Sequence, residues 1–210
     1  DLADGEVWIK VAGCGVCHTD ISFWHNGVQT KHPLPLTLGH EISGVVTAGD
    51  AAWVGKNVII PAVLPCGECK KKKKGRSNIC RNQLMPGNDF HGGFASHIKV
   101  PSRYLCPVPD EVLKKYSLEQ LSVIADAIST SYQVVKKSEL EPGDLAIVIG
   151  VGGVGIYGAL IAKIIGAKVI ALDINDEKLD LAGANGIDAT INIKDLDAKA
   201  VKEKVKERAN

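Results

Sequence analysis

The sequence has no long hydrophobic run, no large excess of either charge and no internal repeat. No apolar stretch in its 210 residues approaches the roughly 20 that a membrane-spanning helix needs. The formal net charge is only +1, so the composition gives no electrostatic reason to expect binding to nucleic acid or to an anionic membrane. The hydrophobic share of 45% is enough for one large domain or two modest ones.

Cysteine is also scarce, since six cysteines are too few for a disulfide scaffold in a chain of this size. Four of them form two pairs with two residues between the partners, Cys14 with Cys17 and Cys66 with Cys69. This spacing favours thiolate metal ligands over disulfides and a reducing compartment, so we predict a cytoplasmic protein. Because the chain begins at Asp1 without methionine and ends on a charged helix, we expect segments to be missing at both ends.

The first part of the chain, to about residue 126, has the pattern of a β-rich domain. Short β-branched runs alternate there with glycine, proline and asparagine, which favour turns. We therefore expect strands over residues 7–11, 43–47, 57–61 and 95–100.

The pattern changes after residue 126 to an alternation of apolar strands and helices. Continuous apolar runs are typical of strands that are buried on both faces of a parallel sheet. The sequence predicts helices over 129–137, 155–166, 178–185 and 199–208, and strands over Leu145–Ile149, Lys168–Asp173 and Ala189–Asn192. This order is the beginning of a doubly wound α/β fold.

A glycine-rich turn lies between the first of these strands and the helix that follows it. Glycine there permits a tight turn, lets the backbone approach a pyrophosphate and allows close helix–strand packing, and the helix N-terminus attracts phosphate. Glycines alone are equally compatible with a structural turn. The candidate cofactor-binding residues of this turn are Gly150, Gly152, Gly153, Val154 and Gly155.

Asp173 supports the dinucleotide interpretation of that turn. It ends the next strand, 18 residues after Gly155, where a carboxylate can accept hydrogen bonds from both hydroxyls of the adenine ribose. The same carboxylate would repel a 2′-phosphate, which favours NAD over NADP. The alternative is that Asp173 merely begins a turn.

Two residues of the β-rich part are candidate metal ligands. Cys17 and His40 lie in loops beside short strands, and zinc accepts sulfur and nitrogen ligands, with one position left open at catalytic sites. Taken singly, a buried free cysteine and a hydrogen-bonded core histidine are the commoner explanations for such residues.

The chain contains three strings in this order: Gly15-Val16-Cys17-His18-Thr19-Asp20, Gly39-His40-Glu41 and the run Gly150 to Gly155. Together these strings resemble the zinc-dependent medium-chain alcohol dehydrogenases. The resemblance extends over nearly the whole chain. It implies an α/β plus β architecture: a GroES-like, partly open β-barrel catalytic domain over 1–127, then the first half of a Rossmann NAD-binding domain over 128–210. It also implies oxidation of an alcohol with NAD and zinc, and a homo-oligomer, either a dimer or a tetramer.

The resemblance also assigns a zinc site. Cys17 and His40 match the first two ligands of the family, and Asp126 stands where many relatives have a third, cysteine ligand. A carboxylate is an acceptable zinc ligand, so we predict a catalytic zinc at these three residues. Glu41 and Asp20 match positions that orient the ligands and tune the metal.

Further roles follow from the same motifs. His18 corresponds to a residue near the cofactor pyrophosphate, and Thr130 to one near the nicotinamide. Thr19 matches the hydroxyl that passes the alcohol proton outward. A relay histidine found three residues farther on in several relatives is Ser22 here, which leaves the final proton acceptor open, with His25 as one candidate.

A second zinc-binding lobe of the family is matched only in part. Cys66, Cys69 and Cys80 correspond to three of its four cysteines, but the fourth position is Lys72. Three thiolates do not close a tetrahedral structural site without another ligand. The remaining cysteines match no ligand and are interpreted as buried or free thiols: Cys14 and Cys106.

Further strings resemble one branch of the family, the 6-hydroxycyclohex-1-ene-1-carbonyl-CoA dehydrogenases of anaerobic benzoyl-CoA degradation. That branch would imply oxidation of a ring secondary alcohol in a CoA thioester to the 6-oxo product. The strings lie at 12–20, 61–66, 85–89, 92–97 and 123–127.

Two alternatives remain open. One is a dehydrogenase of the same type that acts on a simple secondary alcohol or a polyol. The other is a non-catalytic member of the fold, although the retained metal-ligand set argues against it. We also expect the 210 residues alone to be inactive, because half of the cofactor domain would be lacking.

Overall fold

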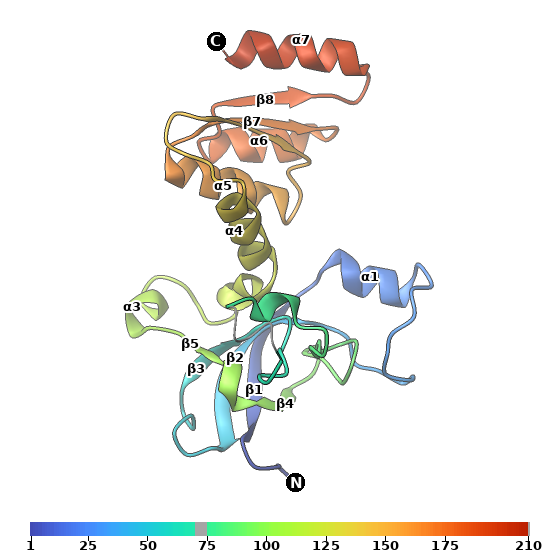
Figure 1. The fold of residues 1–210 in the computed structure, drawn as a ribbon, viewed down its shortest axis with the longest axis vertical. Helices are drawn as coiled ribbons and strands as arrows, with labels where there is room; N and C mark the ends of the chain where they lie inside the picture. Colours follow the sequence, from blue (N-terminus) through green and yellow to red (C-terminus); the bar gives the residue numbers. More distant parts are fainter. Residues whose placement is uncertain (70–74, 210) are drawn as a thin grey trace. The chain divides into compact units, whose positions relative to one another are not determined.

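The computed structural model describes residues 1–69 and 75–209, which form two compact units, Asp1–Asp126 and Ala127–Asn210. The first unit is built on an antiparallel sheet and the second on a parallel sheet with helices on both faces (Figure 1). Among the described residues, none of the helices has the length and apolar character that crossing a lipid bilayer requires.

Five antiparallel strands form the sheet of the first unit, in the order β4-β1-β2-β3-β5. The four strands expected from the sequence are all present, and a short fifth strand at the edge was not predicted. Their bounds are β1 Glu6–Gly15, β2 Glu41–Gly49, β3 Asn57–Ile60, β4 His97–Pro101 and β5 Cys106–Pro107.

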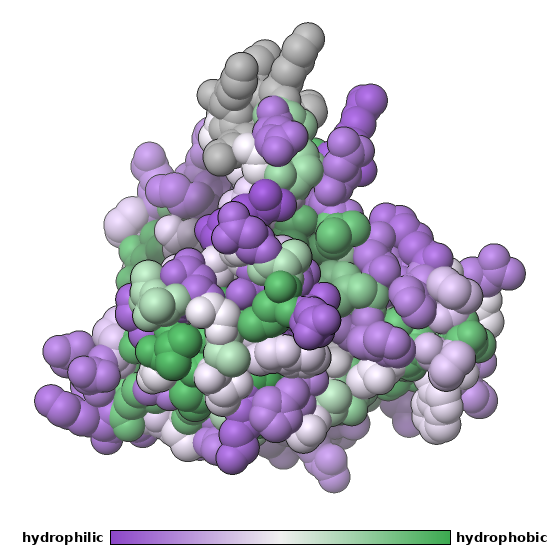
Figure 2. Space-filling view, turned by 90° about the horizontal axis from the view of Figure 1, so that it is seen from below, coloured by the Kyte–Doolittle hydropathy of each residue, from purple (hydrophilic) through white to green (hydrophobic). Residues whose placement is uncertain are grey.

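The larger core cluster of the first unit lies on one face of this sheet, and a smaller cluster around Ile59 lies on the other. Along β1, the buried Val7 and Ile9 alternate with outward-facing residues, as expected for a strand with one covered face. Each pairs across the sheet with a buried partner on β4, Val7 with Val100 and Ile9 with Ile98. On the face of the molecule that Figure 2 shows, apolar side chains gather in small patches between polar ones.

Short helices connect these strands, and none of them was predicted. Each has seven residues or fewer, too few to show a helical period in the sequence. Two of them flank candidate ligands: α1 starts directly after Cys17, and η3 ends directly before Asp126. The helices are α1 His18–Trp24, η1 Ser77–Ile79, η2 Ser102–Tyr104, α3 Asp110–Leu113 and η3 Gln120–Ala125.

The second unit confirms the predicted alternation of strands and helices. Its three strands are parallel in the order β6-β7-β8, the beginning of a Rossmann-type sheet. The bounds are α4 Ala127–Lys137, β6 Leu145–Ile149, α5 Gly155–Ile165, β7 Lys168–Asp173, α6 Asp176–Ala184, β8 Ala189–Asn192 and α7 Ala198–Ala209.

The central strand β7 is buried on both faces. Val169 and Ala171 pack against α5 and α6, whereas Ile170 and Leu172 face α7. This explains why β7 is a continuous apolar run in the sequence. Helix α5 ends at Gly166, which has a φ of 99° and therefore lies in the left-handed region that glycine favours. The polypeptide can then turn directly into β7.

Candidate functional site

Three side chains of the first unit meet although they are far apart in the sequence. Cys17 is the N-cap of α1, His40 precedes β2, and Asp126 follows η3. One ligand atom of each lies within 4.8 Å of the other two. The Asp126 Oδ2 atom is 3.4 Å from His40 Nε2 and 3.9 Å from Cys17 Sγ. We call these residues the catalytic-type cluster.

The backbone around η3 determines where Asp126 lies. The Ser43 hydroxyl donates to the Leu118 carbonyl at 2.6 Å, which fixes the entry to this segment against β2. At the other end, the N–H of Ala62 donates to the Ala125 carbonyl at 3.4 Å. Asp126 thus follows a segment that is attached to β2 at one end and, at the other, to Ala62, just beyond β3.

Asp20 supports two members of the catalytic-type cluster. It is buried, and its Oδ1 atom lies 3.4 Å from His40 Nδ1 and accepts the Gly39 N–H at 2.9 Å. Its Oδ2 atom accepts the Cys17 N–H at 3.0 Å. Burial alone would raise the pKa of Asp20, but the His40 ring and the Cys17 N–H outweigh it and hold that pKa below its usual value.

The surroundings of the His40 ring indicate whether a cation fits in the catalytic-type cluster. The ring is 1% exposed, and neither ring nitrogen has a hydrogen-bond partner of good geometry. Burial disfavours the charged ring, yet Asp126 and Asp20 raise its pKa to about 10. A buried imidazole between two carboxylates requires a positive charge, from a proton or a metal ion. Sulfur, nitrogen and oxygen ligands with one open position match a catalytic zinc.

Glu41 and Thr19 lie close to this cluster. Glu41 is buried at the start of β2, and its carboxylate fills the space that a side chain on Gly15 would need. The Thr19 hydroxyl is 3.7 Å from Cys17 Sγ. A hydroxyl at this position can exchange a proton with a molecule bound beside the sulfur.

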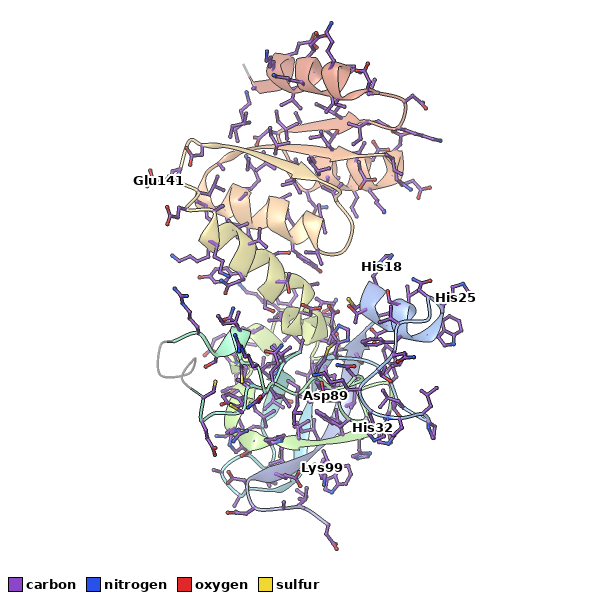
Figure 3. The ribbon with its side chains drawn as sticks, turned by 45° about the vertical axis from the view of Figure 1, so that its right-hand side comes forward. His18, His25, His32, Asp89, Lys99 and Glu141 are labelled. Carbon is purple, nitrogen blue, oxygen red and sulfur yellow. The ribbon has the colours of Figure 1, made fainter. Side chains whose placement is uncertain are left out.

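The two histidines of the α1 region lie at opposite ends of the helix (Figure 3). His18 is its first residue and His25 its C-cap, and both are exposed. His25 is six positions beyond Thr19, about 9 Å along the helix axis at 1.5 Å per residue. A proton can pass between Thr19 and His25 only through intervening molecules, and Ser22, half-buried on the same helix, is nearer in sequence.

The glycine turn of the second unit is open toward solvent where a ligand would lie. A Cβ atom added at Gly152 or Gly153 would meet nothing within 4 Å, so this turn leaves space beside its backbone. Gly150 has a φ of 84°, which favours glycine. A Cβ at Gly155 would collide with the Gly150 carbonyl, and that close approach starts α5 directly after the turn. The turn therefore suits a pyrophosphate at a helix N-terminus.

Asp173 is attached to that turn. Its Oδ2 atom accepts the Val151 N–H at 2.9 Å, and its Oδ1 atom accepts those of Ile174 and Asn175 at 2.8 and 3.0 Å. Burial would raise the pKa of Asp173, but these N–H donors and nearby Lys178 hold it below its usual value. Asp173 is thus a carboxylate that also fixes the geometry of the glycine turn.

Sequence reasoning missed Ser131 on α4. Its hydroxyl is buried, 2.8 Å from the Ala127 carbonyl and 2.7 Å from the Val154 carbonyl, and so connects α4 to the glycine turn. A serine inside a helix was the only available signal. Thr130, the residue before it, is exposed on the same helix.

Cys66, Cys69 and Cys80 form a second cluster, with ligand atoms within 4.8 Å of one another. The N–H of Glu68 and the neighbouring thiol of Cys80 lower the pKa of Cys66 to about 7. Lys72 lies outside the described residues. Of the last two cysteines, Cys14 is half-buried and Cys106 exposed, and burial raises the pKa of Cys14 to about 12.

Family comparisons agree with both parts of the chain. The model of the alcohol dehydrogenase GroES-like domain matches residues 3–110, and that of the zinc-binding dehydrogenase domain matches residues 153–210. The chain therefore belongs to the zinc-dependent medium-chain alcohol dehydrogenase family. The GroES-like unit followed by a Rossmann-type sheet is confirmed.

The names of individual relatives refer to different substrates. An alcohol dehydrogenase of Geobacillus stearothermophilus is 36% identical over 210 residues, which cover 97% of this chain and 61% of the relative. An L-threonine 3-dehydrogenase of Rhizobium etli is 32% identical and covers 91% and 56%. The crystal structure of galactitol-1-phosphate dehydrogenase from Escherichia coli has a TM-score of 0.88 at 29% identity, covering 99% and 59%.

The chain thus spans about 60% of the length of these relatives. Their names refer to an alcohol, a hydroxy amino acid and a sugar-alcohol phosphate, and none refers to a CoA thioester. The comparisons support the family and leave the substrate undetermined.

Proposed function

We propose that this protein oxidises a secondary alcohol, simple or polyhydroxylated, with NAD⁺ as hydride acceptor and zinc at Cys17, His40 and Asp126. The observation that carries the proposal is the convergence of those three ligand atoms within 4.8 Å around a buried imidazole. When bound, zinc would supply a Lewis acid that lowers the pKa of an alcohol, and NAD⁺ would supply the redox chemistry.

The chain's own residues support this chemistry in distinct ways. Asp20 orients the His40 ring and fixes the Cys17 backbone, so the ligand atoms are held before a substrate arrives. The Thr19 hydroxyl, 3.7 Å from Cys17 Sγ, is positioned to accept the proton that the alcohol loses. Glu41, buried at the start of β2, is a further candidate for tuning the site.

The cofactor proposal rests on the glycine turn and Asp173. The open space beside Gly152 and Gly153 suits a pyrophosphate. A carboxylate at Asp173 favours ribose hydroxyls and opposes a 2′-phosphate, so NAD is proposed over NADP. By family resemblance, His18 is proposed near the pyrophosphate and Thr130 near the nicotinamide. The resemblance also motivates a homo-oligomer, and the cysteine spacing motivates a cytoplasmic location.

A CoA thioester of a cyclic secondary alcohol is the second candidate substrate. Its support is the five strings that resemble the thioester branch of the family, among them Met85-Pro86-Gly87-Asn88-Asp89. Such a substrate uses the same ligand atoms and the same hydride acceptor, and it differs only in the group that carries the alcohol.

The experiment is NADH formation by the full-length gene product with zinc, given NAD⁺ and either simple secondary alcohols, polyols or the cyclic hydroxy-enoyl-CoA thioester. Turnover of alcohols or polyols supports the proposal. A strong preference for the thioester transfers it to the second candidate. No turnover of any of them by protein with a full complement of zinc would support a non-catalytic member of the fold.

A further inference from the structure

One end of the glycine turn is attached to β7. The N–H of Gly150 donates to the Leu172 carbonyl at 2.7 Å, and the N–H of Val151 donates to Asp173 Oδ2 at 2.9 Å. Val151 is itself buried. The backbone that enters the turn is therefore fixed by the strand beside it.

The other end of the turn is attached to α4 through Ser131. Helix α4 buries one stripe of side chains with a spacing of four residues, formed by Ala127, Ser131 and Val135, and Ser131 is the polar member of this stripe. The Ser131 hydroxyl lies 2.7 Å from the Val154 carbonyl, and the residue is only 2% exposed. This hydroxyl is therefore a buried polar contact between the helix and the turn.

The Ser131 hydroxyl has two acceptors for a single proton. A serine inside a helix can donate to the carbonyl four residues earlier, and Ser131 lies 2.8 Å from the Ala127 carbonyl. Because a carbonyl cannot donate, this contact and the contact with Val154 use the same proton. The Val154 carbonyl also accepts the Gly158 N–H at 3.1 Å in the first turn of α5. Removing the hydroxyl would thus leave that carbonyl paired, but free to change its direction.

The direction of the Val154 carbonyl determines the direction of the next N–H group. In a planar trans peptide the C=O and the N–H point in opposite directions, so a fixed Val154 carbonyl also fixes the Gly155 N–H. Gly155 is the first residue of α5, and the N–H groups of a first helical turn lack intrahelical partners and suit a phosphate. Between the two attached ends, a Cβ atom at Gly152 or Gly153 would meet nothing within 4 Å. The turn is therefore held at both ends and open in the middle.

We propose that Ser131 is a positioning residue for the dinucleotide, because its hydroxyl holds the Val154 carbonyl, and with it the Gly155 N–H, in the orientation that receives the pyrophosphate. Its side chain is buried, so it acts through the backbone of the turn. The inference rests on the proposed NAD-linked function and adds to it a residue outside the glycine motif. Its effect concerns the phosphates and not the ribose, since Asp173 is attached to the turn at Val151.

NADH binding to the Ser131→Ala variant tests this role. The full-length gene product with zinc is titrated with NADH, and the dissociation constant is obtained from the change in nucleotide fluorescence. We expect this constant to rise about 10-fold, equivalent to about 1.4 kcal/mol. The KM for NAD⁺ should rise with kcat unchanged, which is the pattern for a lost binding interaction. Adenosine, which offers ribose hydroxyls to Asp173 but has no phosphate, should bind the variant and the parent equally well.

Two further variants of α4 separate the hydroxyl from the helix that carries it. Ser131→Thr keeps a hydroxyl and should restore NADH binding. Ser138→Ala removes an exposed hydroxyl that donates to the Val135 carbonyl at 2.8 Å, and it should leave NADH binding unchanged.

Three results would overturn the inference, with far-UV circular dichroism as the check on folding. They are an unchanged NADH dissociation constant in Ser131→Ala, an equal loss of adenosine binding, and a Ser131→Thr variant as weak as Ser131→Ala. A parent protein that binds NADH but oxidises no alcohol would contradict the proposed function alone, whereas a parent that binds no NADH would overturn both.

Discussion

The two metal-type clusters of this protein differ in how far apart their residues lie in the sequence. Cys17 and Asp126 of the catalytic-type cluster are 109 positions apart, whereas Cys66 and Cys80 of the three-cysteine cluster are separated by only 14. The first cluster exists only when the whole first unit is folded. The second depends on one short segment and on the bridge between Leu64 and Leu84.

The two clusters also differ in the chemistry of their ligand atoms. The catalytic-type cluster combines sulfur, nitrogen and oxygen, and the buried Asp20 supports it from behind. The cluster of Cys66, Cys69 and Cys80 contains only sulfur ligands. Mixed ligands with a supporting layer suit chemistry, whereas a uniform soft set suits cation retention or exchange. Variants in each cluster should therefore have separate effects.

His40→Ala has the largest expected effect. It removes a metal ligand and leaves Asp20 and Asp126 without the imidazole between them. We expect NADH formation to fall at least about 10³-fold, equivalent to about 4 kcal/mol at the transition state, and bound zinc to fall by one per chain. Activity assays and metal analysis check this, with His97→Ala, at an exposed histidine, as the control. Retained activity in folded His40→Ala would remove this cluster from the mechanism.

Asp20→Asn should have a smaller effect on the same cluster. The amide keeps one acceptor but loses the charge that faces His40 Nδ1 at 3.4 Å. Removing such a supporting carboxylate typically costs about 10–100-fold in metal affinity or activity. Zinc competition with a chelator and steady-state kinetics measure both quantities, and Asp4→Asn at an exposed turn is the control. Equal zinc affinity in Asp20→Asn and the parent would show that Asp20 only caps α1.

The two clusters were unequally predictable from sequence. The spacing of Cys66 and Cys69 is a local signal, so a thiolate site could be proposed from the residues alone. Asp126 could be assigned only through family resemblance, because no local pattern connects it to Cys17 or His40. Its position results from η3 and the attachment of that segment to β2, which are tertiary contacts.

The fold shows the same limit. The β6–β7–β8 unit was predictable because apolar strands alternate with helices and Gly150 lies at the first turn. Helix α1 was missed because seven residues show too little periodicity, although it carries Thr19 and begins directly after Cys17. The buried Ser131 was missed because its partner, the Val154 carbonyl, is 23 positions away.

Cys69→Ser tests the other cluster and should have a moderate effect on stability. A cation bound only to the folded state stabilises it by mass action, so losing a ligand should lower Tm by several degrees when zinc is present. With a chelator present, the variant and the parent should differ little. Calorimetry under both conditions checks this, with Cys106→Ser as the control. The kcat for alcohol oxidation should remain unchanged, and a large loss would mean that the two clusters are coupled.

The smallest expected effect is a pH dependence confined to the catalytic-type cluster. In chelator-treated protein, Asp126 and Asp20 raise the pKa of His40 from 6.5 to about 10. A group whose folded-state pKa is raised stabilises the fold fully below its unfolded pKa, and this contribution is lost as pH rises toward about 10. The free energy of unfolding of the parent, minus that of His40→Ala, should therefore decrease between pH 6.5 and 10 in urea titrations. The free energy of unfolding of the parent, minus that of Cys106→Ser, should not show this decrease, because Cys106→Ser retains His40. A flat difference for His40→Ala would mean that the imidazole is neutral in the metal-free fold, and the two carboxylates would then need another positive partner.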